Sequence, residues 1–295
     1  MNFDPSFKYK LQTSRFRPQA KALYGWYKAI AFPKGRIATE KEQLLKSPDR
    51  YDPEHFELLK NVSVDISHRD GMYTGSTSHY FRVGMSAIRC IDRALGKCPS
   101  PPDVRNILDL PSGYGRVLRF LVQRFPKAQI TASELDKAAV DFCVETFGAK
   151  GSYSSTNLKT YSLENRFDLI WCGSLITHLN HNAIADVLEF FHRHTAPGGM
   201  VVFTTHGTKA AERMKANPFG YAIPPQEAPQ LFSGFEKTGY SYVEYAWEGA
   251  GYGVSLTSKE FIEAEIAKFD DWSPVYFGDH EWDGAQDVHA VVRRA

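Results

Sequence analysis

The chain has 295 residues, of which 35 are Lys or Arg and 34 are Asp or Glu, so its net charge at pH 7 is +1. This balance produces no global field that would attract nucleic acid, and a hydrophobic content of 43% is that of an ordinary folded protein rather than of a disordered one. The length suits one large core, or one core with an appended lobe.

Four cysteines lack the C-x-x-C or paired-histidine spacing of a zinc site, and we expect them to be reduced thiols. They are Cys90, Cys98, Cys143 and Cys172. No run of about eighteen apolar residues suggests a membrane span, and the first residues lack the apolar core of a signal peptide. We therefore expect a cytoplasmic protein that binds no metal.

Residues 1–50 form a basic arm with eleven Lys or Arg and four Asp or Glu, interleaved with aromatic side chains. This composition favours contact with an anionic lipid surface, a phosphorylated substrate or a nucleic acid. The alternative is a solvated helical face whose aromatic rings are buried in the core.

Apolar residues recur at helical spacing over residues 20–30 and 80–95, which predicts a helical N-terminal lobe. Between these helices lies a polar loop, residues 67–78, in which Ser78 is placed to cap the second helix. Because that helix leads to the first predicted strand, we expect the loop to lie over the ligand-binding edge of a sheet.

Strands and helices alternate over the next hundred residues, which predicts an α/β domain with a doubly wound, mostly parallel sheet and helices on both faces. A proline-rich connector, residues 97–102, separates this domain, residues 101–295, from the helical lobe, residues 1–100. The predicted strands are 104–109, 128–133, 150–153, 167–172 and 200–205, and the predicted helices are 115–125, 137–147 and 182–195. A C-terminal extension, about residues 207–295, is expected to shape a substrate pocket. Its predicted helices are 227–237 and 258–269, and its predicted strands are 240–247, 275–278 and 287–293.

The segment Ile107–Leu118 is an apolar run that ends in Asp109, turns through small residues including Gly113 and Gly115, and continues into a helical pattern. Glycine lets the main chain pass close to a ligand, and the N-terminus of the following helix offers unpaired N–H groups. The pattern therefore predicts a loop that binds a nucleoside-bearing ligand.

This loop resembles the cofactor loop of class I S-adenosylmethionine-dependent methyltransferases, in which acid-x-Gly-x-Gly-x-Gly follows the first strand. Asp109, Gly113 and Gly115 match the pattern, whereas Pro111 stands in place of its first glycine and holds φ fixed. The likeness extends over residues 103–206. It implies a seven-stranded Rossmann-like fold, S-adenosyl-L-methionine as cofactor and methyl transfer as the activity.

Glu134 ends the second strand, about twenty residues beyond the glycines, where a carboxylate can accept hydrogen bonds from both ribose hydroxyls. Alternatively, it is an acid favoured by the dipole of the next helix. Tyr73 and His79 are candidate contacts from the polar loop, or ordinary surface residues. The predicted cofactor contacts are Tyr73, Asp109, Pro111, Gly113, Gly115, Glu134, Leu135, Asn157 and Cys172.

Methyl transfer from a sulfonium is an in-line displacement, so an enzyme must aim the acceptor at the methyl carbon and exclude water. A hydroxyl acceptor must also lose a proton, and histidine is the side chain best suited to take it near neutral pH. His178 after the fourth strand and His206 after the fifth are the candidate catalytic residues. Each is otherwise a satisfied histidine at a helix start or strand edge.

The loop after the fourth strand, residues 172–175, lacks the Asn/Asp-Pro-Pro-aromatic run of enzymes that methylate nucleic-acid amines, and it has no acids for a hard cation. These absences favour metal-independent transfer to an oxygen or nitrogen of a small molecule, a sugar or a lipid-linked glycan. Residues 276–289 are rich in aromatic and ionisable groups, as sugar-binding clefts are, or they form a polar loop without a ligand.

Two other functions fit a sheet of this kind. An NAD(P)-dependent oxidoreductase is disfavoured because its Gly-x-Gly-x-x-Gly pattern needs glycine where Leu118 stands, and because Asp109 would crowd a pyrophosphate. A protein that kept the fold for binding alone, docking a partner through the basic arm, is the second alternative.

Overall fold

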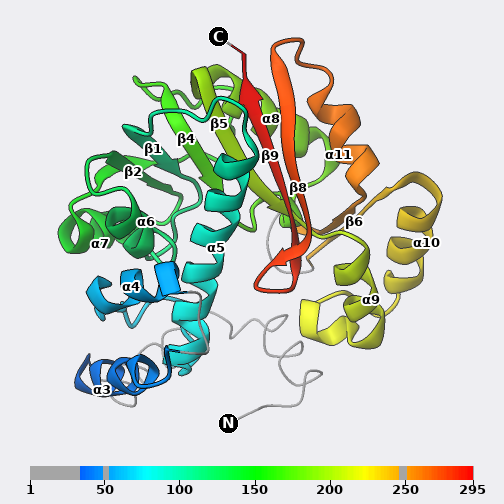
Figure 1. Cartoon of the computed structure of the whole chain (residues 1–295). Coiled ribbons are helices and arrows are strands. Elements are labelled where there is room, and N and C mark those ends of the chain that lie inside the picture. The colour runs from blue at the N-terminus through cyan, green and yellow to red at the C-terminus, as the bar shows by residue number, and fades with distance from the viewer. Residues whose placement is uncertain (1–33, 49–52, 246–250, 295) are drawn as a thin grey trace.

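The computed structural model describes residues 34–48, 53–245 and 251–294, and a seven-stranded sheet lies at its centre (Figure 1). The strand order is β3-β2-β1-β4-β5-β9-β8, and the pairings are parallel except those of β9 with β5 and β8. The strands are β1 (Asn106–Asp109), β2 (Gln129–Glu134), β3 (Lys150–Tyr153), β4 (Phe167–Cys172), β5 (Thr195–Thr205), β8 (Trp272–Trp282) and β9 (Gln286–Arg293). The expected doubly wound α/β fold is confirmed.

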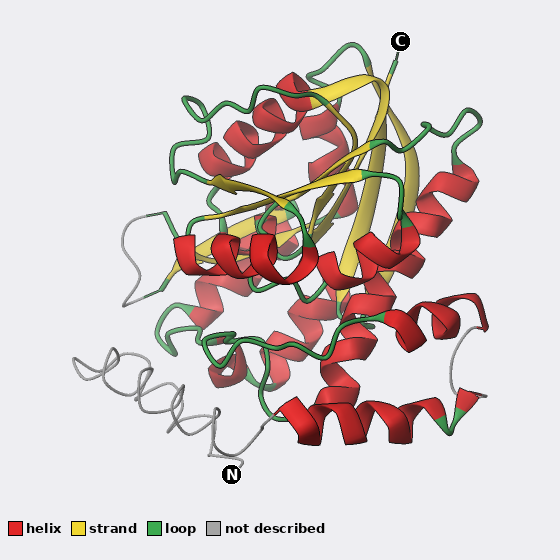
Figure 2. Ribbon diagram, turned by 90° about the vertical axis from the view of Figure 1, so that its left-hand side faces the viewer, coloured by secondary structure: helices red, strands yellow, loops and turns green. Residues whose placement is uncertain are grey.

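Successive side chains of each strand point to opposite faces of the sheet and divide the core into two layers. Ile107 of β1 and Trp171 of β4 belong to one layer, while their neighbours Leu108 and Ile170 belong to the other. Figure 2 shows helices on both sides of the sheet. The first layer includes α3 (Lys34–Leu45), α4 (Pro53–Asn61), α5 (Thr77–Lys97), α6 (Leu118–Arg124) and α7 (Lys137–Phe147), and the second includes α8 (His181–His194) and α11 (Lys259–Ile266).

The N-terminal helices share one hydrophobic core with the sheet. Ile37 of α3 and Phe56 of α4 belong to the same buried cluster as Ile107 of β1. The N-terminal helices and the sheet therefore pack together in the structure. The expected domain boundary near residue 100 stays a prediction. Residues 1–33, which hold most of the basic arm, lie outside the described residues.

Helix α5 begins two residues earlier than its sequence suggests. Ser76 has the extended backbone of an N-cap, and its side chain accepts a hydrogen bond from the His79 N–H at 3.3 Å. The expectation that Ser78 caps this helix is wrong, because the helix already begins at Thr77 and Ser78 lies inside its first turn.

The C-terminal extension contains a second sheet. Strands β6 (Tyr240–Glu244) and β7 (Gly253–Thr257) form an antiparallel pair, which packs with α9 (Thr208–Ala216) and α10 (Ala228–Thr238) around its own buried cluster. Sequence patterns predicted α10 and β6 but not α9 or β7. Short 3₁₀ turns, η2 (Ile176–His178) and η3 (Pro218–Tyr221), complete this region. Among the described helices, none combines the length and the apolar character that crossing a membrane requires.

Candidate active site

The carboxyl ends of the parallel strands meet at one edge of the sheet, which is where doubly wound folds bind their ligands. Asp109 of β1, Glu134 of β2, Cys172 of β4 and Thr205 of β5 all end their strands at this edge. The topology thus brings together three of the predicted cofactor contacts, Asp109, Glu134 and Cys172, and the end of the strand that precedes His206.

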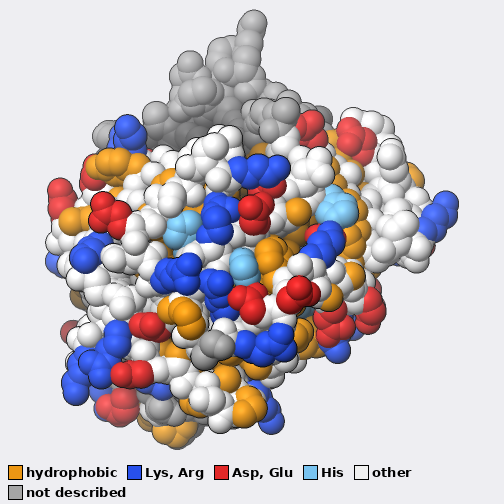
Figure 3. Space-filling view, turned by 90° about the horizontal axis from the view of Figure 1, so that it is seen from above, with side chains coloured by type: hydrophobic (Ala, Val, Ile, Leu, Met, Phe, Trp, Pro, Cys, Tyr) orange, Lys and Arg blue, Asp and Glu red, His pale blue; other side chains and the backbone are white. Residues whose placement is uncertain are grey.

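The opposite edge, seen from above in Figure 3, carries interspersed basic and acidic side chains. A hollow of about 430 Å³ there is lined by residues 162–166, residues 192–194 and Arg293. Two of its arginines are already engaged, because Arg293 pairs with Asp271 at 2.8 Å and Arg193 donates to the Leu158 carbonyl at 2.8 Å. This hollow lies away from the predicted cofactor contacts.

Asp109 is a buried acid next to a second acid. Its side chain is 1% exposed, and its Oδ2 has no hydrogen-bond partner among the described residues. Burial, and then the charge of Glu134, raise the pKa of Asp109 well above its ordinary value. A positively charged ligand would relieve both the desolvation and the repulsion, so this pair favours a cation at the end of β1.

Glu134 bridges the end of β2 and the glycine loop. Its Oε2 accepts a hydrogen bond from the Gly113 N–H at 3.1 Å, and its Oε1 accepts one from the Leu135 N–H at 2.6 Å. Each carboxylate oxygen has a further lone pair, so these bonds fix the carboxylate without exhausting its capacity to accept hydroxyl protons.

The two matching glycines serve different purposes. Both have positive φ, +50° at Gly113 and +76° at Gly115. A Cβ on Gly115 would lie 2.4 Å from the Phe147 ring, so this position needs glycine for packing, whereas a Cβ on Gly113 would meet nothing within 4 Å. Gly113 therefore leaves space open beside Glu134. The bond that precedes Pro111 is cis.

The remaining predicted cofactor contacts differ in exposure. Leu135 is 53% exposed beside Glu134. The Asn157 side chain is also exposed, and its Oδ1 accepts a hydrogen bond from the Lys159 N–H at 3.1 Å.

Two other predicted contacts are buried. Cys172 is fully buried in the layer under α8, and burial raises the pKa of its thiol. Tyr73 is 2% exposed and its hydroxyl lies 3.1 Å from the Thr77 hydroxyl.

The candidate histidines lie in an aromatic cluster between η2 and the small sheet. His178 Nδ1 is 2.9 Å from the Gly253 carbonyl oxygen and 3.0 Å from the Tyr245 hydroxyl, and its ring stacks on Tyr252 with centroids 4.9 Å apart. The His206 ring lies 6.4 Å from that of His178. The topology therefore brings the two predicted histidines side by side.

His206 is the less basic member of this pair. It is 8% exposed, and its Nδ1 has no hydrogen-bond partner in the described part of the chain. Burial, together with the neighbouring His178, lowers the pKa of His206 to about 3. The ring is accordingly neutral near pH 7.

A polar network that sequence patterns did not reveal joins the ends of three strands. Ser174, with φ of +61°, donates its N–H to the Thr204 hydroxyl at 2.8 Å. That hydroxyl donates to Gln286 Oε1 at 2.6 Å, and Gln286 Nε2 donates to the Ser174 hydroxyl at 3.0 Å. The only available signal was Ser174, directly after the predicted fourth strand, because Gln286 reaches the site through the long-range pairing of β9 with β5.

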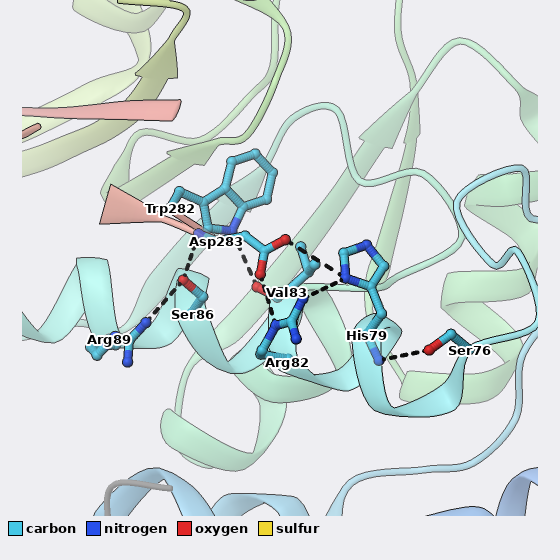
Figure 4. Close-up of polar contacts among 8 residues, drawn as sticks. All are labelled: Ser76, His79, Arg82, Val83, Ser86, Arg89, Trp282 and Asp283. Carbon is cyan, nitrogen blue, oxygen red and sulfur yellow. Dashed lines mark hydrogen bonds and ion pairs between the residues drawn. The ribbon is translucent and has the colours of Figure 1, made fainter. Parts of the chain in front are cut away.

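The turn between β8 and β9 docks on α5, as Figure 4 shows. Asp283 faces the helix, where Arg82 Nε donates to its Oδ1 at 3.1 Å and His79 Nδ1 lies 3.8 Å from its Oδ2. Arg93 pairs with Glu281 of the same hairpin. Two of the acids in residues 276–289, the segment with the composition of a sugar-binding cleft, are therefore paired with side chains of α5.

Trp282 anchors this turn beneath the edge of the sheet. Its indole N–H donates to the Val83 carbonyl at 3.1 Å (Figure 4). Its ring also meets that of Trp171 edge to face, with the ring centroids 5.4 Å apart. The Arg116 guanidinium of the glycine loop lies 5.9 Å from the centroid of the Trp282 ring. The turn thus forms a wall beside the glycine loop.

Comparison with known families decides what kind of site this is. The family model described as a methyltransferase domain matches residues 107–199, which span the glycine loop, Glu134 and His178. These residues form a methyltransferase domain. This match agrees with the resemblance of the glycine loop and the following strands to class I S-adenosylmethionine-dependent methyltransferases.

Individual relatives of the methyltransferase domain are distant. A tRNA1(Val) (adenine(37)-N6)-methyltransferase from Flavobacteriaceae bacterium (strain 3519-10) is 32% identical over 95 residues, which are 30% of this chain and 39% of that protein. The chain thus spans about two fifths of the length of this curated relative.

Two solved structures also align with the chain. One is an S-adenosylmethionine-dependent methyltransferase from Clostridium acetobutylicum ATCC 824, with 13% identity, a TM-score of 0.47, and coverage of 73% of this chain and 92% of that one. The other is CalS10 from Micromonospora echinaspora, an amino pentose methyltransferase, with 16% identity, a TM-score of 0.46, and coverage of 72% and 91%.

Among the described residues, no group of three or more His, Cys, Asp or Glu side chains is arranged to hold a metal ion.

Proposed function

We propose that this chain transfers the methyl group of S-adenosyl-L-methionine to an oxygen or nitrogen of a small molecule, a sugar or a lipid-linked glycan, without a metal. The observation that carries the proposal is the acid pair at the glycine loop. Asp109 is buried with an unpartnered oxygen, and Glu134 is fixed beside it by the Gly113 N–H.

The residues of this edge fit the chemical groups of the cofactor. Asp109 would meet the ammonium group of its amino-acid end, because a buried carboxylate beside another acid is stabilised by a cation. Glu134 would accept hydrogen bonds from the two ribose hydroxyls, and the exposed Leu135 side chain would pack against the adenine ring. When bound, the cofactor supplies a methyl group on a positively charged sulfur, which is open to in-line displacement.

His178 is the proposed general base for a hydroxyl acceptor. A carbonyl oxygen can only accept a hydrogen bond, so the contact with the Gly253 carbonyl places the proton of the neutral ring on Nδ1 and its lone pair on Nε2. The stacked Tyr252 ring and the Tyr245 hydroxyl hold the imidazole in this orientation. His206, with its lowered pKa, fits a role in packing and positioning better than one in accepting a proton.

The loop after β4 supports the proposed acceptor class. Residues 172–175 read Cys-Gly-Ser-Leu, without the Asn/Asp-Pro-Pro-aromatic run used on exocyclic amines of nucleic-acid bases. The distant relative that acts on adenine 37 of a tRNA matches only over 95 residues, so it does not carry that substrate to this chain. The free cysteines, all four of them buried, support a cytoplasmic location, where thiols stay reduced.

The test uses the full chain and S-adenosylmethionine labelled on its methyl group. Incubation with a cell extract that is then separated into small-molecule, glycolipid, RNA and protein fractions should put label into the small-molecule or glycolipid fraction. Label confined to RNA would overturn the acceptor class. Absence of label from every fraction, with no binding of S-adenosylhomocysteine, would overturn the proposed activity.

A further inference from the structure

Arg116 occupies an enclosed position next to the cofactor loop. It directly follows Gly115, and its carbonyl oxygen faces Gly84 of α5 so closely that a Cβ on Gly84 would lie 2.6 Å from it. On its other side, the guanidinium lies over the Trp282 ring at 5.9 Å. Arg116 therefore lies where the glycine loop, α5 and the β8–β9 turn meet, and it is half-buried there.

The guanidinium has no hydrogen-bond or ion-pair partner in the part of the chain that the structure describes, although it offers five N–H donors. Its neighbour Arg119 is fully buried and donates to the carbonyl oxygens of Gly115, Ser63 and Asp65. Burial lowers the pKa of Arg116, whereas the ion pair with Glu281 raises that of Arg93. Arg116 therefore has the environment of an arginine that lacks its anion.

The acids near Arg116 are occupied by other groups. Asp70 accepts from the Tyr80 hydroxyl at 2.6 Å and from the Met72 N–H at 2.8 Å. Asp283 is held by Arg82 and His79. Neither carboxylate lies within ion-pair distance of Arg116, so the charge of this arginine is available to an anionic ligand.

We propose that Arg116 binds the carboxylate of the amino-acid end of S-adenosylmethionine. This inference rests on the proposed function. The amino-acid end of the cofactor carries an ammonium group and a carboxylate on one carbon. The glycine loop has a carboxyl group at its start, Asp109, and a guanidinium cation at its end, Arg116. With the ribose on Glu134 and the ammonium at Asp109, the carboxylate is the group left to meet the guanidinium, which matches its planar geometry.

The experiment compares two ligands by titration calorimetry. S-adenosylhomocysteine has the amino-acid end, whereas 5′-methylthioadenosine has the same nucleoside without it. Arg116→Gln should raise the dissociation constant of S-adenosylhomocysteine at least about tenfold and leave that of 5′-methylthioadenosine unchanged. Arg116→Lys should fall between, since a point charge without the planar fork keeps part of the attraction.

The matched control is Arg166→Gln, on the exposed opposite edge of the sheet, which should change neither constant. Equal weakening of both ligands by Arg116→Gln and Arg116→Lys would show a structural role and overturn the inference. Unchanged binding of both, with a raised KM for the methyl acceptor, would assign the arginine to a carboxylate of the acceptor instead. If the unaltered chain binds neither ligand, the proposed function itself fails.

Discussion

At the scale of single residues, Glu134 is a carboxylate whose position is fixed by two main-chain N–H groups. Glu134→Ala removes the acceptor for the ribose hydroxyls and should weaken binding of S-adenosylhomocysteine by about tenfold or more, as measured by calorimetry. Glu145→Ala, on the exposed side of α7, is the control and should bind normally. An unchanged affinity in Glu134→Ala would remove this residue from the cofactor site.

His178 is expected to affect turnover rather than cofactor binding. Once an acceptor is identified, His178→Gln should lower kcat by roughly 10² to 10⁴, the usual contribution of a positioned base, while the affinity for S-adenosylhomocysteine stays unchanged. His206→Gln should lower kcat much less, because a ring with a pKa of about 3 takes up no proton near neutral pH. Equal losses in both variants would contradict the assignment of the base to His178.

Asp287 links stability to pH. It is 4% exposed, and burial raises its pKa from 3.8 to about 6. The folded state then binds the proton more tightly than the unfolded state, so this group lowers stability progressively as pH rises from about 4 to above 6. At about 1.4 kcal/mol per unit the loss is at most about 3 kcal/mol.

Asp287→Asn removes that pH dependence. Urea unfolding should give a free energy of unfolding close to that of the original chain at pH 4, where the aspartic acid is neutral, and a higher one at pH 8. A difference between the two proteins that is the same at both pH values would show that Asp287 ionises normally in the folded state.

Sequence patterns predicted the positions of some residues of the candidate site. Asp109 and Glu134 end apolar runs, so their placement at the strand ends followed from the strand assignment. The role of Arg116 could not be predicted from the sequence, because an arginine in a loop is usually solvated. Its contacts depend on α5 and on a turn more than 160 residues away in the chain. Gln286 escaped notice for the same reason, since it meets Ser174 only after β9 pairs with β5.

At the scale of elements, the contact of α5 with the glycine loop depends on Gly84. A Cβ there would lie 2.4 Å from the Phe120 ring and 2.6 Å from the Arg116 carbonyl, which is backbone and cannot rotate away. Gly84→Ala should therefore lower the free energy of unfolding by about 1 to 3 kcal/mol, measured by urea titration.

Gly96 of the same helix provides the matched control. A Cβ on Gly96 would meet nothing within 4 Å, so Gly96→Ala should raise stability by up to about 1 kcal/mol through helix propensity alone. Stabilisation by both substitutions would mean that α5 does not approach the loop as closely as the structure shows.

The strands and helices of the parallel sheet were predictable because each has a local pattern of apolar residues and local caps, such as Asp136 at α7 and Asn180 at α8. Strand β7 was missed because its run Gly253–Thr257 is short and only its pairing with β6 makes it a strand. The start of α5 was misplaced because Ser76 and Ser78 are equally good caps by residue type, and the backbone decides between them.

At the scale of the whole molecule, one sheet edge gathers the acid pair, the glycine loop, the paired histidines and the wall formed by the β8–β9 turn. The small sheet of β6 and β7 reaches this edge through His178, which contacts Gly253 and Tyr245. Alternation of strands and helices predicts the edge, because parallel strands end there together. The alternation of strands and helices does not predict which side chains of the β8–β9 turn face this edge. That depends on the long-range packing of the C-terminal hairpin on α5.

A crystal structure of the full chain with S-adenosylhomocysteine tests most directly whether the acid pair binds the cofactor. We expect the ligand at the carboxyl ends of β1 and β2, with its ribose hydroxyls on the Glu134 carboxylate and its ammonium group beside Asp109. A ligand bound elsewhere on the molecule, or crystals that take up NADH at this edge and leave S-adenosylhomocysteine in solution, would contradict this expectation.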